Sequence, residues 1–149
     1  MNRRRFLIAS VGLSLSLLVL FAGAGSWSYL HNRANLFLAV LIKEKLFYLE
    51  LDTEGLMDYC DDFLSSKGSS LMIKTGLAGI YLHWTNDLEI VKQRVGTDKI
   101  DALVDELTLN FLLSSDFFIN ECDEQRTVHF LSLYRPDSAT CRNPFARLD

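Results

Sequence analysis

Acidic side chains gather in two short stretches, and their types are those that bind cations. In "DYCDDF", Asp58 and Asp62 are four residues apart and share one face of a predicted helix. The stretch "SSDFFINECDEQR" supplies oxygen ligands suited to calcium: Asp116, Asn120, Glu121, Asp123 and Glu124. It lacks the spacing and the turn glycine of a twelve-residue calcium loop. We therefore predict no metal site: the first stretch is a solvated helix face, and Ser115 or Asp116 caps a helix start in the second.

Residue types that carry catalysis form no known arrangement. His31, His83 and His129 are far apart in the sequence and lack ligand spacing, so we interpret them as surface or structural residues. None of the eight glycines lies in a dinucleotide-binding or phosphate-binding motif. A nucleophile elbow and a zinc-protease helix motif are also missing from the sequence. The sequence thus predicts a protein that is not an enzyme and that has no catalytic residue and no cofactor.

Three cysteines allow one intramolecular disulfide and leave one thiol. Cys60 falls on the apolar side of a predicted helix, where an unpaired cysteine is usually a small buried residue. Cys122 and Cys141 both lie in the polar C-terminal part, and we expect a bridge between them. No pair has the C-x-x-C spacing of a thioredoxin-like redox site or a zinc ribbon.

The N-terminus has the three parts of an export signal. Arg3, Arg4 and Arg5 precede an apolar run from Phe6 to Ala22, and a small-x-small cleavage pattern follows at residues 22–24. The residues Asn2-Arg3-Arg4-Arg5-Phe6-Leu7 resemble the twin-arginine export signal, whose matching positions are Arg3, Arg4, Phe6 and Leu7.

The same segment also fits a membrane anchor. The run from Phe6 to Ala22 gives roughly 25 Å of helix, short of a hydrocarbon core of about 30 Å. Extension to Leu30 closes this gap, and Trp27 and Tyr29 would then lie at the outer interface. Cleaved export and retained anchor both stay open. Both place the rest of the chain in the periplasm of a bacterium, either facing it from the inner membrane or free within it.

The charge of the chain argues against nucleic acid as a partner. The formal net charge is −4, and without residues 1–24 there are 12 basic and 19 acidic residues, a net of −7. Proteins that bind nucleic acid carry basic patches instead.

Helical spacing of apolar residues predicts an all-α body. Residues 34–49 carry a stripe that includes Leu36, Phe37, Val40, Leu41 and Phe47. Asp52 caps the next helix, whose apolar face ends at Gly68, and residues 71–84 present Leu77, Ile80, Tyr81 and Trp84. Asn86 caps a short fourth helix that stops at Gly96, and a fifth, from Thr97 or Asp98, carries Ile100, Leu103, Val104, Leu107 and Phe111.

The C-terminal part lacks the helical spacing of apolar residues. "TVHFLSLY" alternates like a strand, and "RPDSATCRNPFARLD" contains both prolines and reads as an extended arm. The fold class expected is therefore all-α, with a signal or transmembrane helix, a small helical bundle and an irregular C-terminal arm. The domains expected are residues 1–30 as leader and residues 31–149 as a periplasmic helical domain.

Two resemblances bear on function. "FLLSSDFF", "DEQR" and "YRPDSATCRNPFA" together resemble a C-terminal block of small, uncharacterised bacterial proteins that carry a twin-arginine leader. The leader and the small helical body also resemble accessory subunits of periplasmic flavin-dependent dehydrogenases, such as the gluconate 2-dehydrogenase small-subunit family. The body has no motif that aligns with those subunits, so no functional residue carries over.

The expected function is that of a non-catalytic accessory subunit that exports, anchors or stabilises a larger periplasmic or membrane-associated partner. The resemblance implies that this partner is a flavin-dependent dehydrogenase. The candidate interface is Phe117, Phe118 and Phe145, because aromatic side chains concentrate binding energy. The alternative is a single-span structural or assembly subunit of an envelope complex, with membrane contact through residues 6–30.

Overall fold

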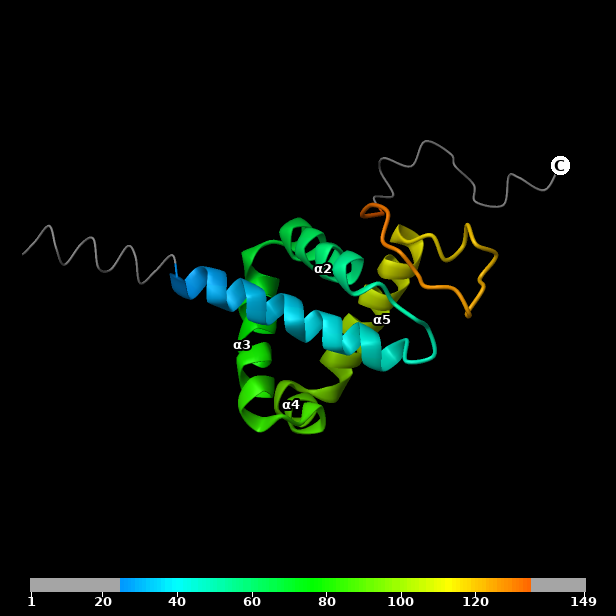
Figure 1. Cartoon of the computed structure of the whole chain (residues 1–149). Helices are drawn as coiled ribbons and strands as arrows, with labels where there is room; N and C mark the ends of the chain where they lie inside the picture. The colour runs from blue at the N-terminus through cyan, green and yellow to red at the C-terminus, as the bar shows by residue number, and fades with distance from the viewer. Residues whose placement is uncertain (1–24, 135–149) are drawn as a thin grey trace, which may run out of the picture.

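The computed structural model describes residues 25–134, and these residues fold into helices. A first helix occupies residues 25–45 and is followed by α2 (Thr53–Lys67), α3 (Ser69–Thr85), α4 (Leu88–Val95) and α5 (Thr97–Ser114) (Figure 1). The predicted all-α class is confirmed for this part of the chain. Arg3, Arg4, Phe6 and Leu7 of the export signal, and the arm with Cys141 and Phe145, lie outside the described residues. Between residues 25 and 134, no helix is long and apolar enough to cross a membrane.

The first helix lies across the other helices and buries one of its sides against them. Its residues Ala34, Leu38, Leu41 and Ile42 are fully buried because they lie on the side against which the other helices pack (Figure 1). The predicted stripe was only partly right. Phe37 and Leu41 are buried, but Leu36 and Val40 face away from the other helices, and Phe47 is exposed because the helix ends at Lys45.

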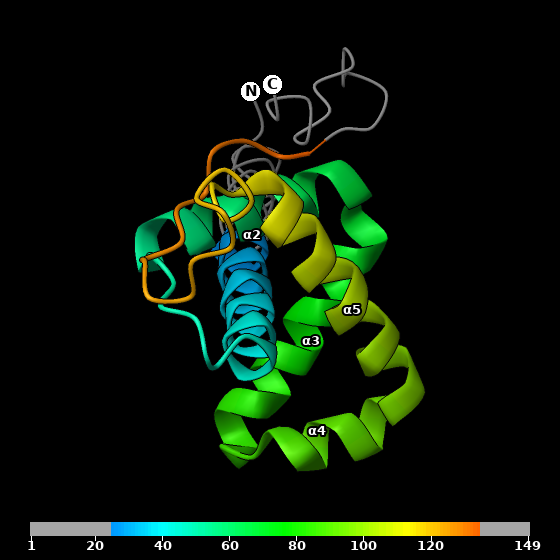
Figure 2. The ribbon, with the colours of Figure 1, turned by 90° about the vertical axis from the view of Figure 1, so that its right-hand side faces the viewer.

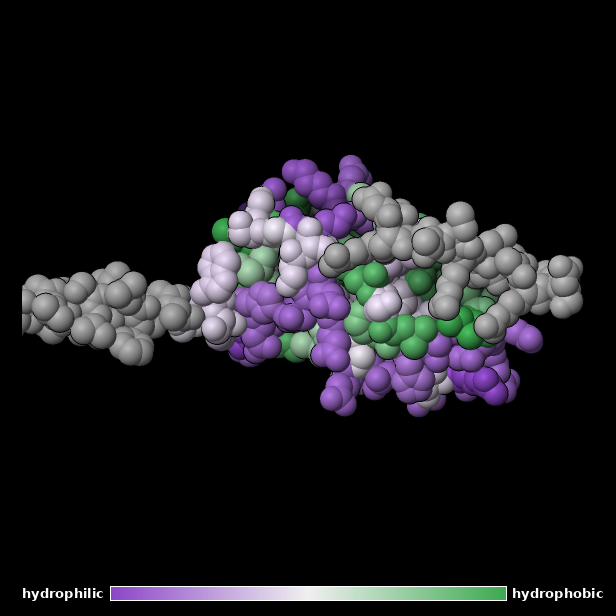
Figure 3. Space-filling view, turned by 90° about the horizontal axis from the view of Figure 1, so that it is seen from above, coloured by the Kyte–Doolittle hydropathy of each residue, from purple (hydrophilic) through white to green (hydrophobic). Residues whose placement is uncertain are grey.

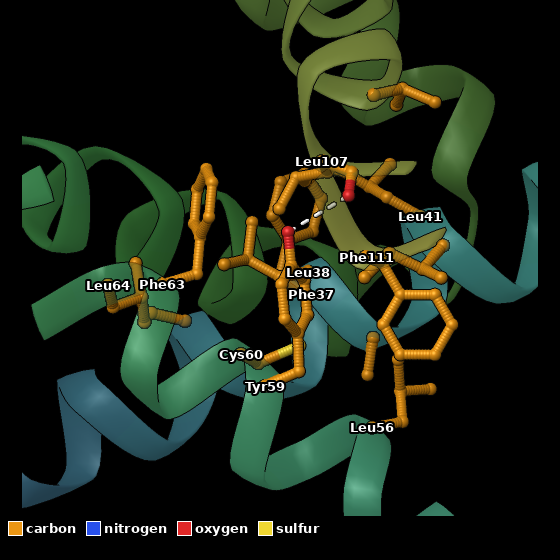
Figure 4. Packing of buried hydrophobic residues seen from close by; sticks show 14 of the residues in the cluster. Phe37, Leu38, Leu41, Leu56, Tyr59, Cys60, Phe63, Leu64, Leu107 and Phe111 are labelled. Atoms are coloured by element: carbon orange, nitrogen blue, oxygen red, sulfur yellow. Dashed lines mark hydrogen bonds between the residues drawn. The ribbon is translucent and has the colours of Figure 1, made fainter. Parts of the chain in front are cut away.

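Tyr59 of α2 lies in the middle of the core. Its hydroxyl donates a hydrogen bond of 2.9 Å to the carbonyl oxygen of Leu107 in α5 (Figure 4). Its ring also packs edge-on against Phe111 and Phe130, with centroid distances of 5.2 and 5.6 Å. Cys60, next to Tyr59, is fully buried, as predicted.

α3 crosses the first helix and packs against it through small residues. The buried side of α3 consists of Met72, Thr75, Gly76, Ala78 and Gly79. A Cβ atom on Gly76 would lie 2.6 Å from Cδ1 of Leu30, so these two helices approach one another closely. The apolar residues predicted to face the core lie elsewhere: Leu77, Tyr81 and Trp84 are exposed.

Side-chain caps set two of the helix starts. The carboxylate of Asp52 accepts a hydrogen bond from the backbone N–H of Gly55, so Asp52 caps α2 as predicted. The cap of α4 is Asp87 and not Asn86, because Asp87 accepts from the backbone N–H groups of Glu89 and Ile90. Asn86 instead ends α3 in the left-handed conformation, with φ of 50°.

The segment after α5 closes the bundle without forming a sheet. In the predicted strand, the described residues contain only isolated bridges, which join Val128 to Leu51 and Phe130 to Ser115. Val128 is buried, so this segment adds to the core through side chains and not through a ladder of strands. The predicted helix start at Ser115 or Asp116 was wrong, because Ser115 ends α5 and a series of turns follows.

Candidate functional site

An exposed apolar surface lies where α5 ends and the following segment returns. Figure 3 shows hydrophobic side chains gathered over this end of the bundle. We define the α5 patch as the exposed residues of this region: Leu113, Phe118, Ile119, Leu131 and Tyr134. Ile119 is the most exposed of them, at 68%. Contiguous exposed apolar residues on a small protein are typical of an interaction site.

Backbone hydrogen bonds to Ser114 bring the two parts of the α5 patch together. The N–H of Leu131 donates to the carbonyl oxygen of Ser114 at 2.9 Å, and the N–H of Tyr134 donates to its hydroxyl at 2.8 Å. Leu131 and Tyr134 are thereby held beside Leu113, the residue that precedes Ser114 in α5. The patch is therefore a fixed surface formed by segments almost twenty residues apart.

Asp116 fixes the turn that carries Phe118 and Ile119. One carboxylate oxygen accepts from the backbone N–H of His129 at 2.8 Å, and the other accepts from the side-chain amide of Asn120 at 3.0 Å. The N–H of Asp116 donates in return to the carbonyl oxygen of His129. The turn ends at Glu121 and Cys122, both with φ near 60°. Asp116 and Asn120, whose oxygen atoms are of the type that binds calcium, thus hold the backbone in place.

The surroundings of the α5 patch are acidic. Residues 115–134 contain four acidic residues and one arginine, Arg126, which pairs with Asp123 at 3.6 Å. Glu121 and Glu124 are exposed at the turn. Across the described part of the chain, no group of three or more His, Cys, Asp or Glu residues is placed to hold a metal ion. The patch therefore combines an apolar centre with a negatively charged rim.

The structure separates the aromatic residues predicted for the interface. Phe117 is partly buried and packs against the core, with its ring 5.4 Å edge-on from that of Phe118. Phe118 is 37% exposed and belongs to the surface. Sequence reasoning missed Leu131 and Tyr134, which reach the patch only through the return of the chain to Ser114.

A second apolar surface lies on α3. Ile73, Leu77, Tyr81 and Trp84 are exposed along one side of this helix, and we call them the α3 face. Trp84 is 82% exposed and Leu77 58% exposed, although the sequence pattern assigned both to the core. The buried side of the helix consists mainly of small residues: Thr75, Gly76, Ala78 and Gly79. Their positions in the sequence could have predicted which side of α3 is exposed.

His31 joins the first helix to α2. Its Nε2 atom lies 2.5 Å from a carboxylate oxygen of Asp61, which also accepts from the amide of Asn35 at 3.2 Å. The hydrogen bond with His31, followed by that with Asn35, lowers the pKa of Asp61. This arrangement fixes the histidine, and we interpret it as a structural tie. Asp58 and Asp62 of the same helix are exposed, as predicted.

The described cysteines differ in environment. Burial raises the pKa of the Cys60 thiol to about 12, so the thiol stays protonated and unreactive at neutral pH. Cys122 is exposed at the end of the turn, where a second thiol can reach it. Its predicted partner Cys141 lies outside the described residues, so the bridge stays a prediction.

Comparison of the chain with protein-family models, with curated proteins and with solved structures finds no match.

Proposed function

We propose that the chain is a non-catalytic accessory subunit that binds a larger protein through the α5 patch on the periplasmic side of a bacterial inner membrane. The observation that carries this proposal is the patch itself, an apolar surface with an acidic rim fixed by Asp116 and Ser114. Protein interfaces combine an apolar core with a polar rim, and aromatic side chains in the core supply most of the binding energy.

The leader supports the location. Arg3, Arg4, Phe6 and Leu7 match the twin-arginine signal, whose route carries folded proteins. A small subunit with this signal is able to take a folded partner that lacks a signal across the membrane with it. The resemblance drawn from the leader suggests a flavin-dependent dehydrogenase as that partner. The acidic rim favours a partner whose contact surface is basic, since opposite potentials steer association.

A second candidate function is that of a single-span structural or assembly subunit of an envelope complex. The observation that favours it is the exposure of Trp27 and Tyr29, at 50% and 46%, directly after the apolar leader. Aromatic residues at this position are typical of the membrane interface. Intact mass of the native protein distinguishes the cleaved from the retained leader. Lysines in place of Arg3 and Arg4 should block export if the twin-arginine route is used, and undiminished export contradicts that route.

Pull-down of the full chain from native membranes in mild detergent tests the partner proposal. We expect one larger protein in a fixed ratio to the chain, and flavin absorbance in the complex if the partner is a dehydrogenase. The double substitution Phe118→Ser with Ile119→Ser should lower its recovery at least about tenfold, because loss of interface anchors costs 1 to 2 kcal/mol or more.

The matched control is Phe47→Ser, because Phe47 is equally apolar, is 83% exposed and lies outside the α5 patch. It should leave recovery unchanged. Equal recovery with the patch variant and the control would overturn the proposal that the α5 patch binds the partner. Envelope or transport components in place of a flavoprotein would favour the second candidate function.

A further inference from the structure

We propose that the α3 face rests on the lipid surface beside the leader, so that α3 lies flat on the membrane while the leader crosses it. This inference rests on the retained form of the leader but not on the α5 patch or on the identity of any partner. The α3 face is defined above as Ile73, Leu77, Tyr81 and Trp84.

The exposed large apolar residues of α3 lie in one row. The four residues of the α3 face follow one another at intervals of four, four and three residues, which places them in a row along one side. All four are exposed, and a different side of the helix is buried. It buries its small residues instead, and the large ones stay available for another surface.

The charge of α3 suits lipid better than an acidic or mixed protein surface. The sequence of α3, "SSLMIKTGLAGIYLHWT", contains no Asp or Glu, although the chain has 19 of them. The first helix, α2, α4 and α5 each contain at least one acidic residue. Lys74 is exposed on α3 next to Ile73. Helices that lie in the membrane interface join an apolar face to basic residues and bind anionic lipids.

The position of α3 places this face toward the leader. Figure 1 shows that α3 is the helix of the bundle nearest the N-terminal end of the first helix and crosses it steeply, and Figure 2 shows the same bundle looking obliquely along the first helix. Gly76 and Gly79 face the first helix at Leu30 and Arg33. Around α3, Leu77 lies about 100° from Gly76, and Gly79 lies about 60° from Gly76 in the other sense. Because Gly79 contacts Arg33 and Gly76 contacts Leu30, Leu77 lies on the N-terminal side of the crossing.

The outer surface of α3 and the aromatic residues of the first helix lie at similar positions along the axis of the first helix. Eight residues separate Gly25 from Arg33, which is about 12 Å along the helix axis. The side chains of α3 reach about 5 to 6 Å from its axis, so its outer surface lies roughly level with Tyr29. Trp27 and Tyr29 are exposed there, and both residue types prefer the membrane interface. The α3 face and these two aromatic residues would therefore meet one lipid surface.

Tryptophan fluorescence of the full chain in vesicles of phosphatidylglycerol and phosphatidylethanolamine tests the proposal. The chain has two tryptophans, so Trp27→Phe leaves Trp84 as the single fluorophore. The reference chain carries Trp27→Phe, Trp84→Phe and Phe47→Trp, so that its single tryptophan is at position 47. Lipids brominated near the headgroup should quench Trp84 at least about twofold more than this reference tryptophan. Phe47 lies beyond the opposite end of the first helix, where the proposal predicts no lipid contact.

Trp84→Phe keeps Trp27 as a reporter of the anchor itself. Quenching of Trp27 with no more quenching of Trp84 than of the position-47 reporter would overturn the proposal while leaving the anchor intact. Absence of quenching at both Trp27 and Trp84 would overturn the anchor and the α3 proposal together. In a folded chain, Leu77→Asp should lower the quenching of Trp84 and leave that of Trp27 unchanged. Neither result affects the partner recovery that tests the α5 patch.

Discussion

Gly79 of α3 lies directly against the backbone of Arg33 in the first helix. A Cβ atom at position 79 would clash with the carbonyl oxygen of Arg33 and would lie 2.9 Å from its carbonyl carbon. The hydrogen on Gly79 is therefore what allows these two helices to cross at this distance. The crossing also decides which side of α3 stays exposed.

Gly79→Ala is expected to lower the free energy of unfolding by about 1 to 3 kcal/mol, the usual cost of overpacking, because two backbones must move apart. Urea denaturation of the full chain in detergent measures this change. Gly25→Ala is the control, since nothing lies within 4 Å of a Cβ atom there. Equal stability of the Gly79 variant and the wild type would show that the helices are not in close contact.

Hydropathy could not predict this crossing. The pattern of large apolar residues correctly gave the buried faces of α2 and α5, where Leu56, Phe63, Leu107 and Phe111 fill the core. In α3 the same reasoning selected Leu77 and Trp84, because periodicity weighs side-chain size and ignores how closely glycine lets two backbones approach. The close packing at Gly76 and Gly79 depends on the position of a helix more than forty residues earlier in the chain.

The hydroxyl of Tyr59 is expected to contribute to stability through its bond to Leu107. Tyr59→Phe removes this hydrogen bond in a fully buried site and should lower the free energy of unfolding by about 1 kcal/mol. Tyr48→Phe is the matched control, because Tyr48 is half exposed, and it should change stability little. Urea denaturation compares the two, and equal effects would contradict a specific role for the hydroxyl of Tyr59.

The buried thiol of Cys60 is expected to make the fold sensitive to alkaline pH. Its pKa rises from 9.0 to about 12 in the folded chain, chiefly through burial. A raised pKa means that the folded state holds the proton more tightly, so this contribution is complete below pH 9 and is lost as the pH rises toward 12. Cys60→Ala should reduce the fall in urea midpoint between pH 8 and pH 10.5. The same fall in variant and wild type would assign the loss to other groups.

The stability of the fold at acidic pH is expected to depend on Asp61. Its pKa is lowered below 3.8 by the hydrogen bond with His31 and then that with Asn35. The stabilisation is therefore present above about pH 3.8 and is lost as the pH falls through the lowered value. Asp61→Asn should cost less than about 1 kcal/mol at pH 7, as exposed pairs do, and should flatten the fall in stability below pH 4.

Asp62→Asn is the matched control for Asp61, because Asp62 is the next residue of α2 and is exposed. It should leave the acid dependence as it is in the wild type. An unchanged acid profile in Asp61→Asn, measured by thermal unfolding between pH 2.5 and pH 5, would contradict the role of the tie between His31 and Asp61.

The candidate site could be predicted from the sequence only in part. Phe118 was identified because it is an aromatic residue in a polar stretch, and it does lie at the surface. Leu131 and Tyr134 were assigned to a possible strand, because no local pattern reveals hydrogen bonds to Ser114 from residues 17 and 20 positions later. Asp116 was expected as a cap of a helix start and instead fixes a turn, since carboxylates that cap helices and those that fix turns are alike in sequence.

A disulfide is expected at the turn that carries Phe118 and Ile119. Cys122 is exposed at the end of the turn, and we expect it to form a disulfide with Cys141 in protein isolated from the periplasmic side. Closure of a loop of this length stabilises by about 3 kcal/mol in the chain-entropy model. Alkylation and mass spectrometry without reduction should therefore modify neither residue, and Cys122→Ser should lower the melting temperature. Cys60 is the internal reference, because it is buried and should react only after unfolding. Free thiols at both 122 and 141 in such material would end the proposal of a bridge.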